Sequence, residues 1–415
     1  MKKILSFFAM SAIVLGMAFT FNACGGNDAN NPEPPENPQV NNEYFTVAVS
    51  PVEPAANQQV KIQITITARK DVYRFVLTDF TKKEAEDEGC LTLEGLLEKY
   101  PDITTSNLHT SLGKPLEYTE LKSFDTEYVL VLFALDDKKQ PIADSWIVIT
   151  FKTPSAEALL NGAINGLFTV GQNQQVRFSK GNLRHNPVSG VWAFAEKQYD
   201  FVGKGNAYIS PNYDGWIDLF GWGTGNNPTL STIENSDYAT FTNWGNNPIS
   251  NGGDKAHQWR TLTQSEWDYL LRVRANAKGL FGFGTVNGVN GLIILPDNWT
   301  LPTGLNFTPS TKQGLNSHEG YYYNANENNF SHNAFTAIQW ADQMQPAGAV
   351  FLPAAGYREG TEVSLVGSAG HYWLSTPRKK EGYSSAGEFN SSALTLDYDY
   401  FVYRGRSVRL VQDVK

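Results

Sequence analysis

The first candidate for acid–base chemistry is Glu266, which lies in the segment QWRTLTQSEWDYLLRVR, residues 258–274. It follows Thr263 by three residues. This spacing is typical of a capping box, in which the threonine hydroxyl accepts from the backbone N–H of the glutamate and the glutamate accepts from that of the threonine. Trp267 and the leucines that follow then fall on one helix face. The pattern predicts a helix that begins after Thr263, and capping alone accounts for Glu266.

Nucleophilic and metal chemistry find little support in the sequence. The chain has two cysteines, Cys24 and Cys90, and none of its six histidines has the spacing of a metal-ligand pair. The glycine-rich segment GLFGFGTVNG at 279–288 lacks the preceding strand and the following lysine of a phosphate-binding loop. We interpret this segment as a turn-rich loop, and we expect neither a metal nor a cofactor.

Aromatic and amide side chains make a better case for a binding site. Sugar-binding sites combine an aromatic face with hydrogen bonds from amide and carboxylate groups. Trp222, Trp244 and Tyr322 can supply aromatic faces, and Asn246 and Asp254 can supply hydrogen bonds. The alternative is that the aromatic side chains pack the core or brace loops, as large aromatic residues commonly do.

The N-terminus has the pattern of a secretory signal. Two lysines precede an apolar run, and the small residue Ala23 stands directly before Cys24. The sequence FNAC resembles the relaxed lipobox of Bacteroidota lipoproteins, which implies a signal peptide over 1–23, a lipid on Cys24 and an anchor in the outer membrane, exposed at the cell surface. Residues 24–43 are rich in Gly, Asn, Pro and acidic residues and predict a disordered tether. The alternative is a secreted protein in which Cys24 is incidental.

Composition and charge narrow the class of protein. The formal net charge is −9, so a basic surface that would hold nucleic acid is not expected. Aromatic residues make up 13% of the chain, and glycine occurs 36 times. This mixture favours short strands joined by many turns.

Two regions of different pattern follow the tether. Residues 44–153 alternate apolar and polar side chains with period two, around a helical stretch whose leucines at 91, 93, 96 and 97 form an apolar face. This predicts a β-sandwich with a helical insertion, and FDTEYVLVLFALDD resembles a late strand of immunoglobulin-like and fibronectin type III modules. Residues 154–166 form a predicted linker, and 167–415 one large domain with few helices.

Short motifs in the C-terminal region resemble the formylglycine-generating-enzyme (sulfatase-modifying) family. They are WRTLTQSEWDY (259–269), GHYWLSTP (370–377) and GRSVRLV (405–411). The segments GWIDLFGWGTG (215–225), GLIILPDNW (291–299) and LPAAGYREG (352–360) are similar to the Fibrobacter major paralogous domain. The resemblance implies a C-type-lectin-like fold, so the expected fold class is mainly β with an α+β C-terminal domain.

The resemblance does not extend to the chemistry. Formylglycine-generating enzymes hold copper with two C-terminal cysteines, whereas residues 167–415 contain no cysteine. The E-P-N and W-N-D signatures of calcium-dependent lectins are missing, and the two acids of DYDY (397–400) are too few for a calcium cage. We therefore expect no enzyme activity. The expected function is non-catalytic binding of a glycan or a surface protein through loops at 223–254 and 318–332. A structural subunit of a pilus or matrix, or an enzyme of unfamiliar type, are the alternatives.

Overall fold

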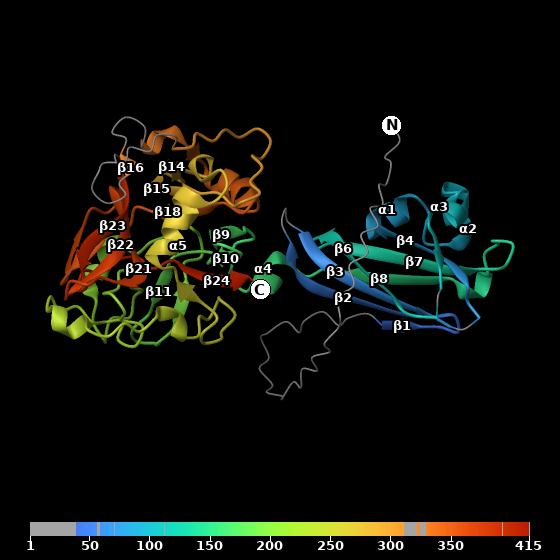
Figure 1. Cartoon of the computed structure of the whole chain (residues 1–415), viewed down its shortest axis with the longest axis horizontal. Helices are drawn as coiled ribbons and strands as arrows, with labels where there is room; N and C mark the ends of the chain where they lie inside the picture. The colour runs from blue at the N-terminus through green and yellow to red at the C-terminus, as the bar shows by residue number, and fades with distance from the viewer. Residues whose placement is uncertain are drawn as a thin grey trace. The chain divides into compact units, whose positions relative to one another are not determined.

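The structure is a computed structural model that describes residues 39–55, 59–69, 71–111, 113–310, 322–323, 329–391 and 393–414. It is 39% strand and 18% helix, which confirms the predicted mainly-β class (Figure 1). The predicted signal peptide, Cys24 and most of the predicted tether lie outside the described residues. Within the described ranges, no helix is both long and apolar enough to cross a membrane.

Residues 39–152 contain two antiparallel sheets of four strands. The strands are β1 Gln39–Asn41, β2 Phe45–Ala55, β3 Gln59–Ala68, β4 Arg74–Thr81, β5 Leu108–Thr110, β6 Leu116–Ser123, β7 Glu127–Leu135 and β8 Ile147–Lys152. Their order is β1-β2-β3-β6 in the first sheet and β5-β4-β7-β8 in the second. A shared apolar core joins the two sheets. It receives every second residue of β3, namely Val60, Ile62, Ile64 and Ile66, as the period-two pattern predicts.

The predicted helical insertion packs against the second sheet. Its helices are α1 Lys82–Asp87, α2 Leu93–Lys99 and α3 Ile103–Ser106. Leu96 of α2 joins a separate apolar cluster with Val129 of β7, so β7 is buried on both of its faces. Leu91 was expected on the apolar face, but it is 37% exposed because it lies in the turn before α2.

The C-terminal part follows α4 (Ala156–Leu160) and is built from small sheets (Figure 1). Its strands are β9 Phe168–Gly171, β10 Gln174–Phe178, β11 Leu183–His185, β12 Trp192–Phe194, β13 Arg260–Thr261, β14 Phe281–Val286, β15 Val289–Ile294, β16 Tyr322–Tyr323, β17 Ala334–Phe335, β18 Val350–Pro353, β19 Tyr357–Glu359, β20 Glu362–Ser364, β21 Ala369–Pro377, β22 Tyr383–Asn390, β23 Ala393–Phe401 and β24 Leu410–Val414. The four-stranded sheets have the orders β13-β24-β10-β9, β17-β14-β15-β18 and β16-β23-β22-β21, and β11-β12 and β19-β20 are two-stranded.

Two longer helices of this part start with capping boxes and end in π-helical turns. Helix α5 (Gln264–Asp268) continues as η5 (Tyr269–Val273), and α6 (Ala337–Gln339) continues as η8 (Trp340–Met344). The capping box of Thr263 and Glu266 is present, which confirms that prediction. Short 3-10 helices also occur among the described residues. One of them, η1 Ala143–Ser145, lies in the N-terminal part, and the others lie in the C-terminal part: η2 Gly203–Tyr208, η3 Asn235–Tyr238, η4 Trp244–Asn246, η6 Ala277–Gly279 and η7 Phe330–His332.

The glycine-rich segment at 279–288 is not a loop, which corrects our interpretation. It forms β14, which pairs with β15 in a hairpin that turns at Asn287 and Gly288. Both turn residues have positive φ, at 51° and 77°, as a two-residue hairpin turn requires. Within β14, a Cβ on Gly284 would lie 2.7 Å from the carbonyl oxygen of Asn333, so this glycine permits a close backbone approach.

Candidate functional site

Four of the segments that carried the resemblance meet in the tertiary structure. The backbone bridges that join them are Tyr372–Ser407, Phe220–Arg406 and Arg358–Gly405. The closing segment 405–411 therefore contacts 215–225, 352–360 and 370–377. Arg406 is completely buried at this junction, and a buried charge needs partners that compensate for lost hydration.

The partners of Arg406 form a group that we call the charged cluster: His371, Glu388, Tyr400 and Arg406. His371 lies on β21, Glu388 on β22 and Tyr400 on β23, which are neighbouring strands of one sheet (Figure 1). The hydroxyl of Tyr400 donates to Oε2 of Glu388 at 2.5 Å. The guanidinium carbon of Arg406 lies 3.9 Å from the centroid of the Tyr400 ring, as in a cation–π contact.

Burial and neighbouring charges set the charge state of the charged cluster. Nη1 of Arg406 lies 2.7 Å from Nδ1 of His371, and the same ring nitrogen lies 3.4 Å from Oε2 of Glu388. Burial and the charge of Arg406 lower the pKa of His371. Burial opposes ionisation of Glu388, but His371, Tyr400 and the charge of Arg406 together lower its pKa to about 2. At neutral pH the cluster thus holds one anion, one cation and a neutral imidazole.

A group of half-buried rings, which we call the aromatic patch, borders the charged cluster: Tyr357, Tyr383, Phe401 and Tyr403. The Phe401 ring centroid lies 4.6 Å from that of Tyr383 and 5.1 Å from that of Tyr403. Tyr357 meets the imidazole of His371 edge-on, with centroids 5.1 Å apart, and this contact joins the patch to the charged cluster.

Charged side chains flank the aromatic patch. The guanidinium carbon of Arg404 lies 5.1 Å from the Tyr357 ring and 5.6 Å from the Phe401 ring, and its Nε donates to Glu359 at 3.0 Å. The amine of Lys380, which is exposed, lies 3.9 Å from the centroid of Tyr383. Accessible aromatic faces beside cations and a carboxylate are suited to stacking on a ligand ring and to hydrogen bonding with its polar groups.

Trp222 and Trp244 belong to the core, which corrects their expected role in ligand stacking. Trp222 is 6% exposed, and its Nε1 donates to the carbonyl of Leu374 at 3.0 Å. Trp244 is fully buried and packs edge-on against Phe241, with centroids 5.8 Å apart. Neither indole presents a face to solvent. The predicted binding loop 223–254 and the residue directly before it therefore contribute large side chains to the core.

The remaining predicted site residues occupy different settings. Asn246 and Asp254 are exposed, and Asp254 has a left-handed backbone with φ of 50°. Tyr322 pairs through its backbone with Leu394, at the opposite end of β23 from Phe401. The side chain of Tyr322 and most of the predicted loop 318–332 lie outside the described residues.

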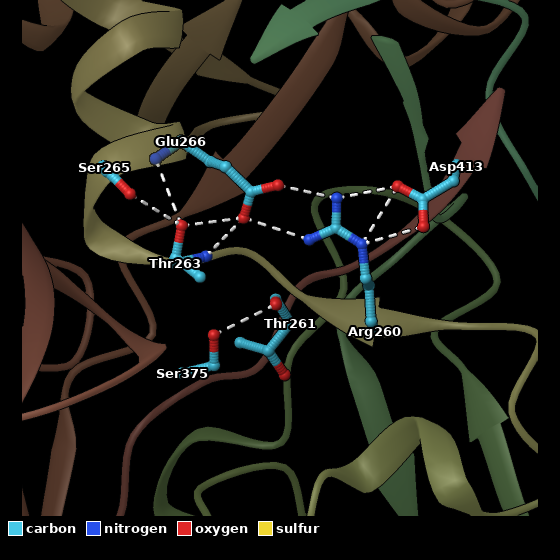
Figure 2. A network of polar contacts seen from close by, with 7 residues as sticks. All are labelled: Arg260, Thr261, Thr263, Ser265, Glu266, Ser375 and Asp413. Carbon is cyan, nitrogen blue, oxygen red and sulfur yellow. Dashed lines mark hydrogen bonds and ion pairs between the residues drawn. The ribbon is translucent and has the colours of Figure 1, made fainter. Parts of the chain in front are cut away.

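Glu266 is committed to structural contacts, as Figure 2 shows. Its Oε2 accepts from the backbone N–H of Thr263 at 2.7 Å, which closes the capping box. Its two oxygens also accept from Nη1 and Nη2 of Arg260 at 3.0 and 2.6 Å. Arg260 in turn donates to Asp413 of β24. This network ties the start of α5 to the C-terminal strand and leaves Glu266 engaged on both oxygens.

One internal cavity of the C-terminal part is too small to serve as a ligand site. Its volume is about 10 Å³, and the side chains around it are apolar or aromatic: Trp267, Leu271, Leu292, Leu352, Tyr372, Phe389, Leu394 and Leu396, with Gly387. That volume is close to the minimum for a single water molecule. In the part of the chain that the structure describes, no three His, Cys, Asp or Glu side chains are grouped to hold a metal ion.

Comparison with known proteins gives no further assignment. No family of known proteins, no curated protein and no solved structure shows a significant match to this chain.

Sequence reasoning missed the charged cluster and the aromatic patch because their members are scattered over the last sixty residues and Glu388 belongs to no motif. A signal was present, however. His371 interrupts the apolar run of GHYWL, and Arg406 directly precedes the segment SVRLV. A polar residue within an apolar strand indicates a buried polar contact.

Proposed function

We propose that this chain is a lipid-anchored cell-envelope protein whose C-terminal part binds a glycan without catalysis. The observation that carries the binding proposal is the aromatic patch, which is partly accessible and is flanked by Lys380, Arg404 and Glu359. A sugar-binding site needs an aromatic face on which the sugar ring stacks and polar side chains that form hydrogen bonds with its hydroxyl groups, and this surface offers both.

The protonation state of the charged cluster supports binding over catalysis. General acid catalysis at neutral pH needs a group whose pKa lies near 7. The pKa of Glu388 is about 2, and that of His371 is lowered by burial, so neither group exchanges a proton readily at that pH. Glu388 instead offers a permanent carboxylate, 24% exposed, that can accept hydrogen bonds from sugar hydroxyls.

The same proposal includes the finer fold assignments, an immunoglobulin-like module followed by a C-type-lectin-like domain. For the first, the hydroxyl of Tyr128, near the start of β7, accepts from the backbone N–H of Ser123 at 3.0 Å, a contact of the tyrosine-corner type. For the second, the segments that carry the family resemblance meet at one junction: 215–225, 352–360, 370–377 and 405–411. Segments that belong to the core of one common fold are expected to lie together in this way.

A glycan array with the purified full chain tests the binding proposal. We expect retention of at least one glycan class, and we expect Tyr383→Ala and Lys380→Ala each to weaken it by about tenfold, which corresponds to ~1.4 kcal/mol. Tyr208→Ala is the matched control, because Tyr208 is 69% exposed and belongs to neither the patch nor the cluster. Failure of the wild-type chain to retain any glycan would remove the proposal. If a surface protein instead co-purifies with the chain in a stoichiometric amount, the alternative function, a structural subunit of a surface assembly, would be favoured.

Membrane fractionation tests the anchor. We expect the wild-type chain in the outer-membrane fraction with labelled fatty acid attached, and Cys24→Ser in the soluble envelope fraction without label. Protease shaving of intact cells then reports exposure at the cell surface. Cys90→Ser is the control, because Cys90 is buried within the N-terminal sheets and helices and cannot accept a lipid there.

A further inference from the structure

Three ionisable side chains converge between the two N-terminal sheets, apart from the site described above. The amine of Lys122 contacts Oδ2 of Asp79 and lies 2.6 Å from Oε2 of Glu120. Lys122 and Glu120 lie on β6 of the first sheet, whereas Asp79 lies on β4 of the second. A covalent bond between Lys122 and Asp79 would therefore join the two sheets.

The surroundings of these groups are largely apolar. The Lys122 side chain is 10% exposed, and those of Asp79 and Glu120 are 20% and 26% exposed. In the sheet ladders, Lys122 stands opposite Val60 of β3, and Asp79 stands opposite Leu130 of β7; both partners are fully buried. The amine also lies 5.1 Å from the Tyr128 ring centroid. Such a site weakens solvation of the ions and limits the access of water that would hydrolyse an amide.

We propose that Lys122 and Asp79 condense to form an intramolecular isopeptide bond, with Glu120 as the proton-transferring catalytic residue. The reactants are an ammonium and a carboxylate. One proton passes from the Lys122 ammonium through Glu120, the freed amine attacks Cγ of Asp79, and an N–C bond forms. A C–O bond then breaks, and the oxygen leaves as water with the remaining protons. Atoms and charge balance without an oxidant, reductant or cofactor.

Contact geometry favours this reaction, whereas the ion pairs oppose its first step, because burial lowers the pKa of Lys122 but Asp79 and Glu120 together raise it above its usual value. Holding the amine against the carboxyl makes the step intramolecular, which in well-aligned systems removes a large entropic barrier. Burial and the charge of Asp79 raise the pKa of Glu120 above its usual value, so this carboxyl holds a proton more readily than an exposed glutamate does. Glu120 can therefore both accept the proton of the amine and donate it to the departing oxygen.

Peptide mapping of the purified full chain tests the proposal. Trypsin should release the peptide Phe75–Lys82 only as a branched product joined to the peptide that carries Lys122, with a mass lower by one water than the sum of the two. Fragmentation should place the branch at Asp79 and Lys122. Recovery of Phe75–Lys82 unlinked from the folded wild-type chain would overturn the proposal and leave a plain ion-paired triad.

Two comparisons sharpen the test. The pair Lys61–Glu53 has a similar distance of 3.1 Å, but its side chains are 39% and 52% exposed, so the same digest should contain no link between them. Glu120→Gln keeps the shape of the side chain and removes its proton transfer, and we expect the linked fraction to fall from near complete to undetectable. A link that persists in Glu120→Gln would overturn the role of Glu120, and a Lys61–Glu53 link would show that burial does not select the reacting pair.

Discussion

Arg260 and Glu266 form a two-point ion pair at the start of α5, with nitrogen–oxygen distances of 3.0 and 2.6 Å (Figure 2). The same glutamate closes the capping box with Thr263, and the same arginine binds Asp413 on β24. A helix terminus is thereby fixed to the last strand of the chain. The pair gives arginine and glutamate a structural reason to occur together in this segment.

Loss of Glu266 should destabilise the C-terminal part. We expect Glu266→Ala to lower the free energy of unfolding by about 2 kcal/mol, because it removes a helix cap and a charge-assisted hydrogen-bond pair. Urea unfolding followed by tryptophan fluorescence measures this, since nine of the ten tryptophans follow residue 166. Asp268→Ala is the control. Its pair with Arg272 is an i,i+4 surface contact, worth only about 0.3–0.5 kcal/mol. Equal losses for the two variants would contradict the structural role of Glu266.

Replacement of the core tryptophans should affect stability directly. We expect Trp222→Ala and Trp244→Ala each to cost about 3–5 kcal/mol, because each removes a buried indole and leaves a cavity. Trp222→Ala also leaves the carbonyl of Leu374 without the indole donor. Urea unfolding of each variant, followed by far-UV circular dichroism, checks this. A loss below 1 kcal/mol for either variant would indicate an accessible ring, and would restore that residue as a candidate for ligand contact.

Acidification should destabilise the fold through His185. This side chain is 6% exposed, packs on Trp192, and burial lowers its pKa to about 4. The unfolded imidazole binds a proton below pH ~6.5, whereas the folded one does so only near pH 4. The unfolded state therefore gains protons first, and stability falls as the pH drops through this window, by up to about 3 kcal/mol. His185→Phe should flatten the dependence between pH 6.5 and 4. Parallel pH profiles for wild type and variant would contradict the prediction.

Ionisation of Glu388 should affect the stability of the fold at lower pH than protonation of His185 does. Its folded pKa of about 2 lies below the ordinary value of 4.5. A carboxyl with a lowered pKa contributes stability that is fully present above pH ~4.5 and is lost as the pH falls toward 2. We expect a contribution of up to about 3 kcal/mol, measured as the difference between wild type and Glu388→Gln in urea unfolding at successive pH values. A difference that stays constant from pH 5 to pH 2.5 would show that Glu388 is not held ionised by its neighbours.

Local sequence patterns predicted local structure well where one interaction dominates. Thr263 and Glu266 are close in sequence, so the capping box needed no tertiary information. The period-two alternation of β3 likewise specified which side chains enter the core. The glycine-rich β14 was misinterpreted because its glycines serve close packing against Asn333, a residue distant in sequence.

The sequence by itself determined the mainly-β class, the helix start at Thr263 and the alternation of the N-terminal strands, because these depend on neighbours within a few residues. The tertiary structure alone decided which aromatic residues are accessible, because Trp222 and the rings of the aromatic patch are all aromatic, and their burial depends on what packs over them. It also decided the convergence of Lys122 with Asp79, and of His371 with Arg406, because sheet pairing and sheet stacking bring together polar side chains that are 43 and 35 residues apart.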